Sequence, residues 1–454
     1  MQVIHAARAL LPQGWAKDVR LGVDAGCFSR IEVGAAAAPG DERHATVLPG
    51  VPNLHSHAHQ RGMAGLAERR GPSVDSFWSW RDVMYRYALA MTPEQLEAIA
   101  SQLYVEMLEA GYTRVGEFHY LHHDRDGKPY ANPAEMALRL AAAAEYSGIG
   151  MTLLPVFYAR STFGGAAAGV AQRRFVNDVA GYARLLDASR AALKSLDGAI
   201  VGVAPHSLRA VTPDELAAVV GLADGAPVHI HVAEQIKEVE DCIAWSGARP
   251  VQWLLDHAPV DSRWCLVHAT HMNGDECRRI AASGAVVGLC PITEANLGDG
   301  IFDAPPFVEA GGRYGIGSDS NVQIGVADEL RLLEYSQRLA QRARNVMAGA
   351  GGSSGRALVD AAVAGGHRAL GSALNGTYGL CIGASADMVS LAHEHSALAG
   401  DDGDAILDAW IFTGAFRVDC VWARGRRQVS GGRHHRRDEI NLPFAAALNA
   451  LRRV

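Results

Sequence analysis

Histidines and a carboxylate follow several short apolar runs of this sequence, at the point where each run ends. His55 and His57 end the first run, His231 ends PVHIHV, and Asp319 ends RYGIGSD. Side chains two residues apart on a strand point to the same face, so His55 and His57 can hold one ion together. Three histidines and one carboxylate that leave room for a water are typical of a catalytic metal site. We therefore predict that these four residues bind one divalent ion per subunit.

Two further residues near these runs could handle protons. Glu234 stands three residues after His231 in HVAE, and His268 ends the run WCLVHA. A carboxylate at position 234 could reach a metal-bound water without being a ligand. The alternative is an ordinary solvated acid in the first turn of a helix, where the helix dipole favours it. Beside a metal ligand we favour a proton shuttle, with His268 as a second proton-handling or oxyanion-stabilising group.

This set of residues indicates a hydrolytic reaction. A bound divalent ion lowers the pKa of water from about 15.7 to about 7, which makes hydroxide available at neutral pH. Asp319 could ligate the ion and also orient or deprotonate that water. Hydroxide would attack an sp² carbon, Glu234 would carry the proton to nitrogen, and ammonia would leave. The expected reaction is hydrolysis at a C=N or C–N centre.

The apolar runs themselves predict the fold. Short β-rich runs alternate with Ala- and Leu-rich helical stretches, which is typical of a parallel α/β fold. There are eight runs, at residues 46–54, 113–118, 151–158, 199–205, 227–232, 264–269, 285–290 and 313–319. They predict a (β/α)₈ TIM-like barrel, in which catalytic side chains lie at the C-terminal ends of the strands. His229 shares a face with His231 but lies deeper, so we expect it to be a hydrogen-bonded core residue.

Both ends of the chain have a different texture, with short strands and turns before and after the barrel runs. We expect them to form a small β-sandwich domain built from both termini. The predicted domains are a composite β-sandwich of 1–47 and 384–454 and a metal-dependent barrel of 48–383.

Composition restricts the class of protein. Lys and Arg total 42 against 49 Asp and Glu, a formal net charge of −7, which argues against nucleic-acid or anionic-membrane partners. Seven cysteines without a CxxC pair fit a reducing cytosol. The first residues lack the apolar core of a signal peptide, and no run of 18 apolar residues occurs. A cytoplasmic protein is expected.

The motifs HSH, HVAE, VHAT and GIGSDS, in this order, resemble the mononuclear deaminase branch of the amidohydrolase superfamily. The resemblance implies that His55, His57, His231 and Asp319 bind the metal. It also implies that Glu234 and His268 handle protons, and that the terminal segments form a composite sandwich. No lysine ends the fourth run, where binuclear members keep a carbamylated bridging lysine, so a single ion is expected.

Five longer segments resemble the formimidoylglutamate deiminases within this branch. They are NLHSHAHQRGMAGLAE, SFWSWRDVMYR, EFHYLHHD, HSLRAVTP and TEANLGDGIF, and the resemblance extends over nearly the whole chain. It implies hydrolysis of N-formimidoyl-L-glutamate to N-formyl-L-glutamate and ammonia in histidine degradation, by a homodimer. The sequence departs from the family pattern at His59, where an aromatic residue is usual, and at Asn321, where His is frequent.

A substrate with two carboxylates calls for arginine, whose planar guanidinium makes paired charge-assisted hydrogen bonds. The resemblance implies that Arg81 and Arg209 contact the glutamate part of the substrate. The remaining substrate contacts implied by the family are Gln60, Tyr120 and His206. Trp78 and Trp80 are expected to anchor the packing of the segment 60–90, which is the candidate lid.

Two alternatives remain open at this stage. A related deaminase of a heterocycle such as guanine, cytosine or a thioadenosine would use the same metal residues, but its pocket would favour stacking walls and amides over two arginines. A non-catalytic barrel should have gaps among the metal and proton-handling residues, and this chain keeps all six. Zinc is the favoured ion for three histidines and an aspartate, although iron or manganese could take the same ligands.

Overall fold

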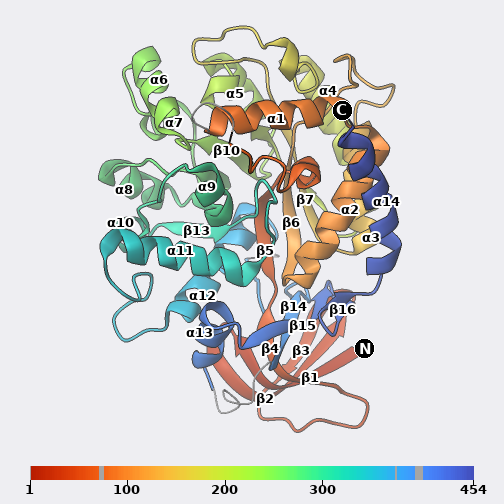
Figure 1. Cartoon of the computed structure of the whole chain (residues 1–454). Helices are drawn as coiled ribbons and strands as arrows, with labels where there is room; N and C mark the ends of the chain where they lie inside the picture. Colours follow the sequence, from red (N-terminus) through yellow and green to blue (C-terminus); the bar gives the residue numbers. More distant parts are fainter. Residues whose placement is uncertain (1, 71–75, 374–375, 394–401, 454) are drawn as a thin grey trace.

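Parallel strands at eight places around a ring form the centre of the molecule. Helices surround these strands, and a separate sheet lies below them (Figure 1). The structure is a computed structural model that describes residues 2–70, 76–373, 376–393 and 402–453. The barrel strands are β5 (Val51–Ser56), β6 (Tyr112–His119), β7 (Gly150–Phe157), β8 (Ile200–Val201) with β9 (Ala204–Pro205), β10 (Val228–Val232), β11 (Trp264–His268), β12 (Val286–Leu289) and β13 (Arg313–Ile316).

Hydrogen bonding closes these strands into a ring. One parallel sheet has the order β5-β6-β7-β8, with β9 on β7, and a second has the order β10-β11-β12-β13. Bridges between Val203 and Val228 and between Ser56 and Asp319 join the two sheets. The predicted TIM-like barrel is therefore confirmed. Strands β6 and β7 are buried at every residue, as expected for parallel strands covered by helices on one side and packed inside on the other.

The helices begin where the sequence supplies caps. Thr92 and Thr212 each precede a proline at the first helical position and accept a hydrogen bond from the backbone of Gln95 and Glu215, respectively. The barrel helices are α1 (Phe77–Ala90), α2 (Pro93–Glu109), α3 (Glu135–Ser147), α4 (Val179–Ala192), α5 (Pro213–Gly221), α6 (Ile236–Ser246), α7 (Pro250–His257), α8 (Gly274–Ser283), α9 (Pro291–Leu297), α10 (Ala304–Glu309), α11 (Val326–Gln341) and α12 (Ser354–Ala369), with 3₁₀ turns η1 (Ala58–Met63), η2 (Val170–Gln172) and η3 (Leu208–Ala210). None of the helices in the described ranges has the length and apolar composition needed to span a bilayer.

Strands from both ends of the chain form one continuous sheet beneath the barrel (Figure 1). Its order is β17-β16-β15-β14-β4-β1-β2-β3, and β4 joins the two ends by pairing with both β1 and β14. Its own apolar core includes Phe28 and Trp422. The strands are β1 (Gln2–Leu11), β2 (Gly14–Asp24), β3 (Cys27–Glu32), β4 (Glu42–Pro49), β14 (Met388–His393), β15 (Phe416–Ala423), β16 (Arg426–Ser430) and β17 (Arg433–His434).

Two details differ from the sequence prediction. The run 46–54 was predicted as one strand, but it divides at Gly50 into β4 of the terminal sheet and β5 of the barrel. A Cβ at position 50 would lie 2.4 Å from the Thr113 side chain, so only glycine fits at this crossing. The C-terminal segment also contains α13 (Ala405–Phe412) and α14 (Arg437–Leu451), and α14 lies beside α2 of the barrel. Residues 394–401 of that segment lie outside the described residues, and the division into 48–383 against 1–47 and 384–454 remains a proposal.

Gly365 offers a test of how closely α12 packs on the barrel. A Cβ at this position would lie 1.8 Å from the Tyr314 carbonyl oxygen of β13, so Gly365→Ala must push the helix away. We expect a loss of about 3 kcal/mol in the free energy of unfolding, at the upper end for overpacking. Gly221→Ala in α5 is the control, because nothing lies within 4 Å of that Cβ. Denaturant unfolding of both variants measures the difference, and equal stabilities would contradict the packing argument.

Candidate active site

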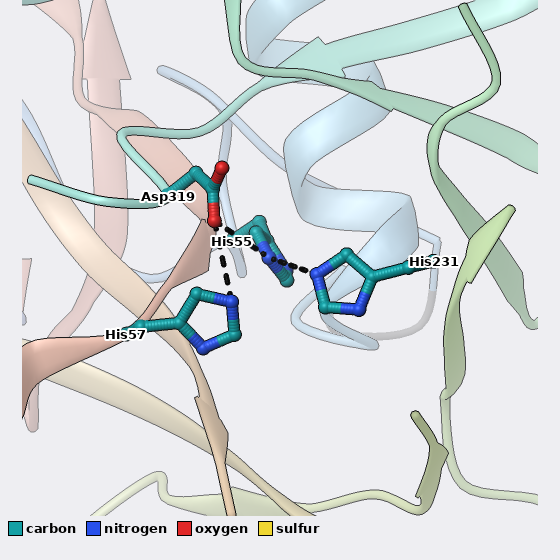
Figure 2. A group of neighbouring side chains, drawn as sticks. All are labelled: His55, His57, His231 and Asp319. Carbon is teal, nitrogen blue, oxygen red and sulfur yellow. Dashed lines mark hydrogen bonds and ion pairs between the residues drawn. The ribbon is translucent and has the colours of Figure 1, made fainter. Parts of the chain in front are cut away.

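The four predicted metal ligands converge at the C-terminal end of the barrel (Figure 2). Asp319 Oδ1 lies 3.3 Å from His55 Nε2 and 3.2 Å from His57 Nε2. The Nε2 atoms of His55 and His231 are 3.0 Å apart. All four ligand atoms lie within 4.8 Å of one another, and all four residues are buried. Residues 264 positions apart in the chain therefore form one compact group of ring nitrogens and a carboxylate.

The chemistry of these donors fits a divalent ion. His57 Nδ1 lies 2.8 Å from the Phe118 carbonyl oxygen, and His231 Nδ1 lies 3.0 Å from the His206 carbonyl oxygen. Each Nδ1–H therefore donates outward, which leaves the Nε2 lone pair directed to the centre of the group. Burial lowers the pKa of His55 to about 3 and keeps that ring in its neutral, ligating form. Neutral imidazoles with one carboxylate are the donors expected around zinc.

The backbone beside the site is strained. Left-handed conformations occur at Ala233, His268, Ala269, Asp319 and Asn321, with φ between 44° and 65°, at or just after the ends of β10, β11 and β13. Such conformations in residues other than glycine cost about 1–3 kcal/mol each and persist where the surrounding structure enforces them. Their concentration at one end of the barrel indicates a functional centre.

Asn321 joins the first and last strands of the barrel beneath the metal group. Its Nδ2 donates to the backbone carbonyls of His57 and Asp319, each at 3.0 Å, and to Ser56 Oγ at 3.2 Å. Its Oδ1 accepts from Ser318 Oγ at 2.6 Å. The departure from the family pattern at this position therefore places a fully buried amide that ties two ligand-bearing segments together.

We expect Asn321→Ala to weaken metal binding. The substitution removes both carbonyl contacts that hold the His57 and Asp319 segments, so the ligands lose their alignment. Affinity for zinc should fall about 10–100-fold, as is typical when partners of metal ligands are removed. Competition with a chromogenic chelator measures the dissociation constant directly. An unchanged constant in a folded variant would show that the strands hold the ligands without this amide.

Glu234 and His268 lie on the side of the metal group that faces the cavity. His268 Nε2 is 3.8 Å from both Glu234 Oε1 and Asp319 Oδ2. Burial raises the pKa of Glu234 to about 7. Burial lowers the pKa of His268, but Glu234, Glu294 and Asp319 around the ring outweigh it and raise that pKa well above its usual value. This arrangement can store and transfer a proton near neutral pH.

One cavity contains almost all of the predicted site. Of the predicted residues, only His55 does not line it. The lining includes all five predicted substrate contacts together with His57, His231, Glu234, His268 and Asp319. Sequence reasoning did not assign a further set of largely aromatic residues that line the same cavity, namely Phe77, Met84, Tyr85, Tyr158, Phe175 and Leu297, and it treated Trp80 as a packing residue only.

The chain matches two models of known protein families. The amidohydrolase family matches residues 46–427, which is most of the chain. The chain belongs to the amidohydrolase family. Residues 1–45 match the N-terminal domain of formimidoylglutamate deiminase HutF. The predicted resemblance is thereby confirmed.

Individual relatives agree with this assignment. A formimidoylglutamate deiminase from Pseudomonas aeruginosa is 51% identical over 99% of this chain and 100% of its own. An amidohydrolase from Brucella melitensis of known crystal structure is 62% identical, with a TM-score of 0.97 over 99% of this chain and 100% of that one. An adenosine deaminase from Xanthomonas campestris with bound zinc has a TM-score of 0.80 over 100% and 99% of the two chains, and at 22% identity it shows the fold alone.

Two arginines line the cavity of this amidohydrolase. The Arg81 guanidinium lies 4.5 Å from the centroid of the Trp78 ring, and Arg209 Nε lies 3.9 Å from Glu238 Oε2. Among the described residues, neither arginine has a hydrogen-bond partner for its buried Nε. Gln60 donates from Nε2 to Tyr120 Oη at 2.9 Å, while its buried Oε1 also has no partner in the described ranges.

Two carboxylates of this amidohydrolase were missed in sequence reasoning. Glu238 accepts from the backbone N–H of Ala233 and Glu234, at 3.1 and 3.3 Å, and so holds the turn that carries Glu234. Glu294 lies 3.2 Å from His268 Nδ1. Glu238 is the third residue of α6, where a glutamate side chain commonly reaches back to backbone N–H groups before the helix, and that position was a usable signal. Glu294 in TEANLGDGIF has no spacing that points to His268.

Proposed function

We propose that this amidohydrolase hydrolyses N-formimidoyl-L-glutamate to N-formyl-L-glutamate and ammonia, a reaction of histidine degradation. The observation that carries the proposal is that two arginines line the same cavity as the metal group. A diacid with a small C=N group matches this combination, because the arginines can bind the carboxylates while the metal group faces the reacting carbon. The name and full-length coverage of the Pseudomonas relative support the same substrate.

The ion is proposed to be one Zn²⁺ per subunit, held by His55, His57, His231 and Asp319. When bound, it would act as a Lewis acid that makes water nucleophilic at neutral pH. Three imidazoles and a carboxylate support zinc over magnesium or calcium, which prefer oxygen ligands. Iron and manganese remain the alternatives that metal analysis of the purified protein would distinguish.

The proton transfers are proposed for Glu234 and His268. Water adds to the formimidoyl carbon, and Glu234 takes a proton from it and delivers it to the formimidoyl nitrogen. The hydroxyl left on that carbon then gives up its proton, through Glu234, to the same nitrogen as the C–N bond breaks, so that ammonia leaves and the water oxygen becomes the formyl oxygen. His268 Nε2 lies 3.8 Å from Glu234 and from Asp319. It would stabilise the charge that develops on the oxygen added to the formimidoyl carbon. Asp319 would also help to orient the water.

Substrate binding is proposed to use Arg81 and Arg209 for the two carboxylates. Gln60, Tyr120 and His206 would donate or accept hydrogen bonds at a carboxylate or at the formimidoyl nitrogen, because all three line the same cavity as the arginines. Among these three in the described residues, the buried Oε1 of Gln60 has no hydrogen-bond partner, so a substrate N–H could satisfy it.

We also propose a cytoplasmic homodimer. The cytoplasmic location is supported by seven free cysteines. The dimer rests on the resemblance to the family, and sedimentation of the purified protein tests it.

Ammonia release by zinc-loaded protein tests the function. N-formimidoyl-L-glutamate should be turned over with kcat/KM of about 10⁴ M⁻¹s⁻¹ or more. Guanine, cytosine, 5′-methylthioadenosine and N-formimidoyl-L-aspartate are the comparison substrates. Turnover of a heterocycle without turnover of formimidoylglutamate would retain the metal site and overturn the substrate assignment.

A further inference from the structure

Glu294 lies behind the His268 ring, on the side away from the cavity. Its Oε1 is 3.2 Å from His268 Nδ1, whereas Nε2 of the same ring faces Glu234 and Asp319. Glu294 is buried and is not among the residues that line the cavity. It therefore contacts a residue of the proposed mechanism without access to the substrate.

The same carboxylate oxygen is fixed from a second direction. The backbone N–H of Cys290 donates to Glu294 Oε1 at 2.8 Å, across the first turn of α9. A carboxylate oxygen accepts hydrogen bonds, so the contact with His268 requires that Nδ1 carries a hydrogen. The helix terminus thus holds the acceptor in place, and the acceptor determines which nitrogen of the ring points to the cavity.

The backbone of His268 makes such support necessary. His268 and Ala269 have φ of 65° and 47°, so the chain leaves β11 in a strained left-handed turn. At such a turn, the direction of the ring is not fixed by the regular pleat of a strand. Glu294 supplies a fixed point on the far side of the ring.

We propose that Glu294 is a positioning residue that sets the orientation of His268, an inference that rests on the proposed function. With Nδ1 bonded to Glu294, Nε2 is the atom presented toward Glu234, Asp319 and the substrate. The arrangement is the general one in which a carboxylate behind a histidine orients the ring nitrogen that acts.

The chain offers a matched control in Glu329. This residue of α11 is also fully buried, and its Oε2 accepts from the backbone N–H of Ile292 at 2.9 Å in the same first turn of α9. Among the described residues it has no hydrogen bond or ion pair with His268. Glu329→Gln therefore perturbs the same helix terminus without touching the ring.

The first experiment compares Glu294→Gln, Glu294→Ala and Glu329→Gln in zinc-loaded protein. Glu294→Ala should lower kcat about 10–100-fold while KM and bound zinc stay unchanged. Glu294→Gln should retain more activity, because its amide oxygen can still accept from Cys290 and His268. Added formate should restore part of the activity of Glu294→Ala, and Glu329→Gln should match wild type. Wild-type kcat in Glu294→Ala, or an equal loss in Glu329→Gln, would overturn the positioning role.

A second readout is independent of any substrate. In protein labelled with ¹⁵N-histidine, the His268 Nδ1–H resonance is identified by its absence in His268→Asn. It should be protected from exchange with water in wild type and lost in Glu294→Ala. Persistence of a protected resonance in Glu294→Ala would overturn the proposal. If the resonance is lost in Glu294→Ala but the wild type does not turn over N-formimidoyl-L-glutamate, the proposed substrate is refuted and the positioning role stands.

Discussion

Glu234→Gln should retain the metal and lose most of the turnover. Glutamine has the shape of glutamate but cannot take up and release a proton, so the transfer from water to the leaving nitrogen loses its carrier. We expect kcat to fall about 10³-fold, within the range for general acid–base groups. Glu234 is not in the group of four possible ligands, so zinc content should equal that of wild type. Steady-state kinetics and metal analysis on the same preparation measure both quantities.

The position of Glu234 makes this variant a clean test. The residue is held through its backbone N–H by Glu238 Oε2, a contact that the substitution leaves in place. Glu240→Gln on the exposed face of α6 is the control for a general effect on this helix. Loss of zinc in Glu234→Gln would mean that the carboxylate is a ligand. Undiminished kcat would assign the proton transfer to another group, with His268 as the first alternative.

The barrel and the metal group could be predicted because they depend on short-range signals. Parallel strands buried on both sides are continuous apolar runs, and catalytic residues at barrel mouths directly follow them. His55, His57, His231 and Asp319 each stand at such a run end, and the structure brings them together. His229 was predicted to be a deeper core residue, and its Nε2 lies 2.7 Å from the Ala369 carbonyl oxygen.

The rest could not be predicted because it depends on contacts between distant segments. Phe175 lines the cavity from a loop whose path is set by tertiary packing. Glu294 reaches His268 only because α9 follows β12 directly and turns its first residues toward β11. The return of α14 to the barrel depends on pairs such as Arg437 with Glu109, which are 328 residues apart in the sequence. Residue spacing carries no trace of such contacts.

Replacement of Arg209 should weaken substrate binding. Arg209→Met removes one of the two guanidinium groups proposed to bind the substrate carboxylates. It also leaves Glu238, whose side chain is fully buried, without its ion-pair partner. Truncating one partner of a buried charged pair typically costs about 2–5 kcal/mol, so kcat/KM for formimidoylglutamate should fall at least about 30-fold. Most of the loss should appear as a higher KM, because neither carboxylate takes part in the bond changes at the formimidoyl carbon.

Arg338→Met separates the loss of substrate contact from the cost of an unpaired buried glutamate. Arg338 pairs with Glu334, whose side chain is also fully buried, on α11 and outside the cavity lining. This variant should keep the KM of wild type even where its stability falls. If both variants raise KM equally, the effect of Arg209→Met is a consequence of misfolding around an unpaired carboxylate.

Two analogues then show which carboxylate Arg209 binds. N-formimidoyl-4-aminobutyrate lacks the carboxylate next to nitrogen, and N-formimidoyl-2-aminobutyrate lacks the distal one. If Arg209 binds one particular carboxylate, the penalty of Arg209→Met disappears with the analogue that lacks it and persists with the other, as in a double-mutant cycle. Arg81→Met should show the opposite dependence, because each of the two arginines is proposed to bind one of the two carboxylates. A full penalty with both analogues would mean that Arg209 does not bind a carboxylate, and the substrate would have to lie differently between the arginines and the metal group.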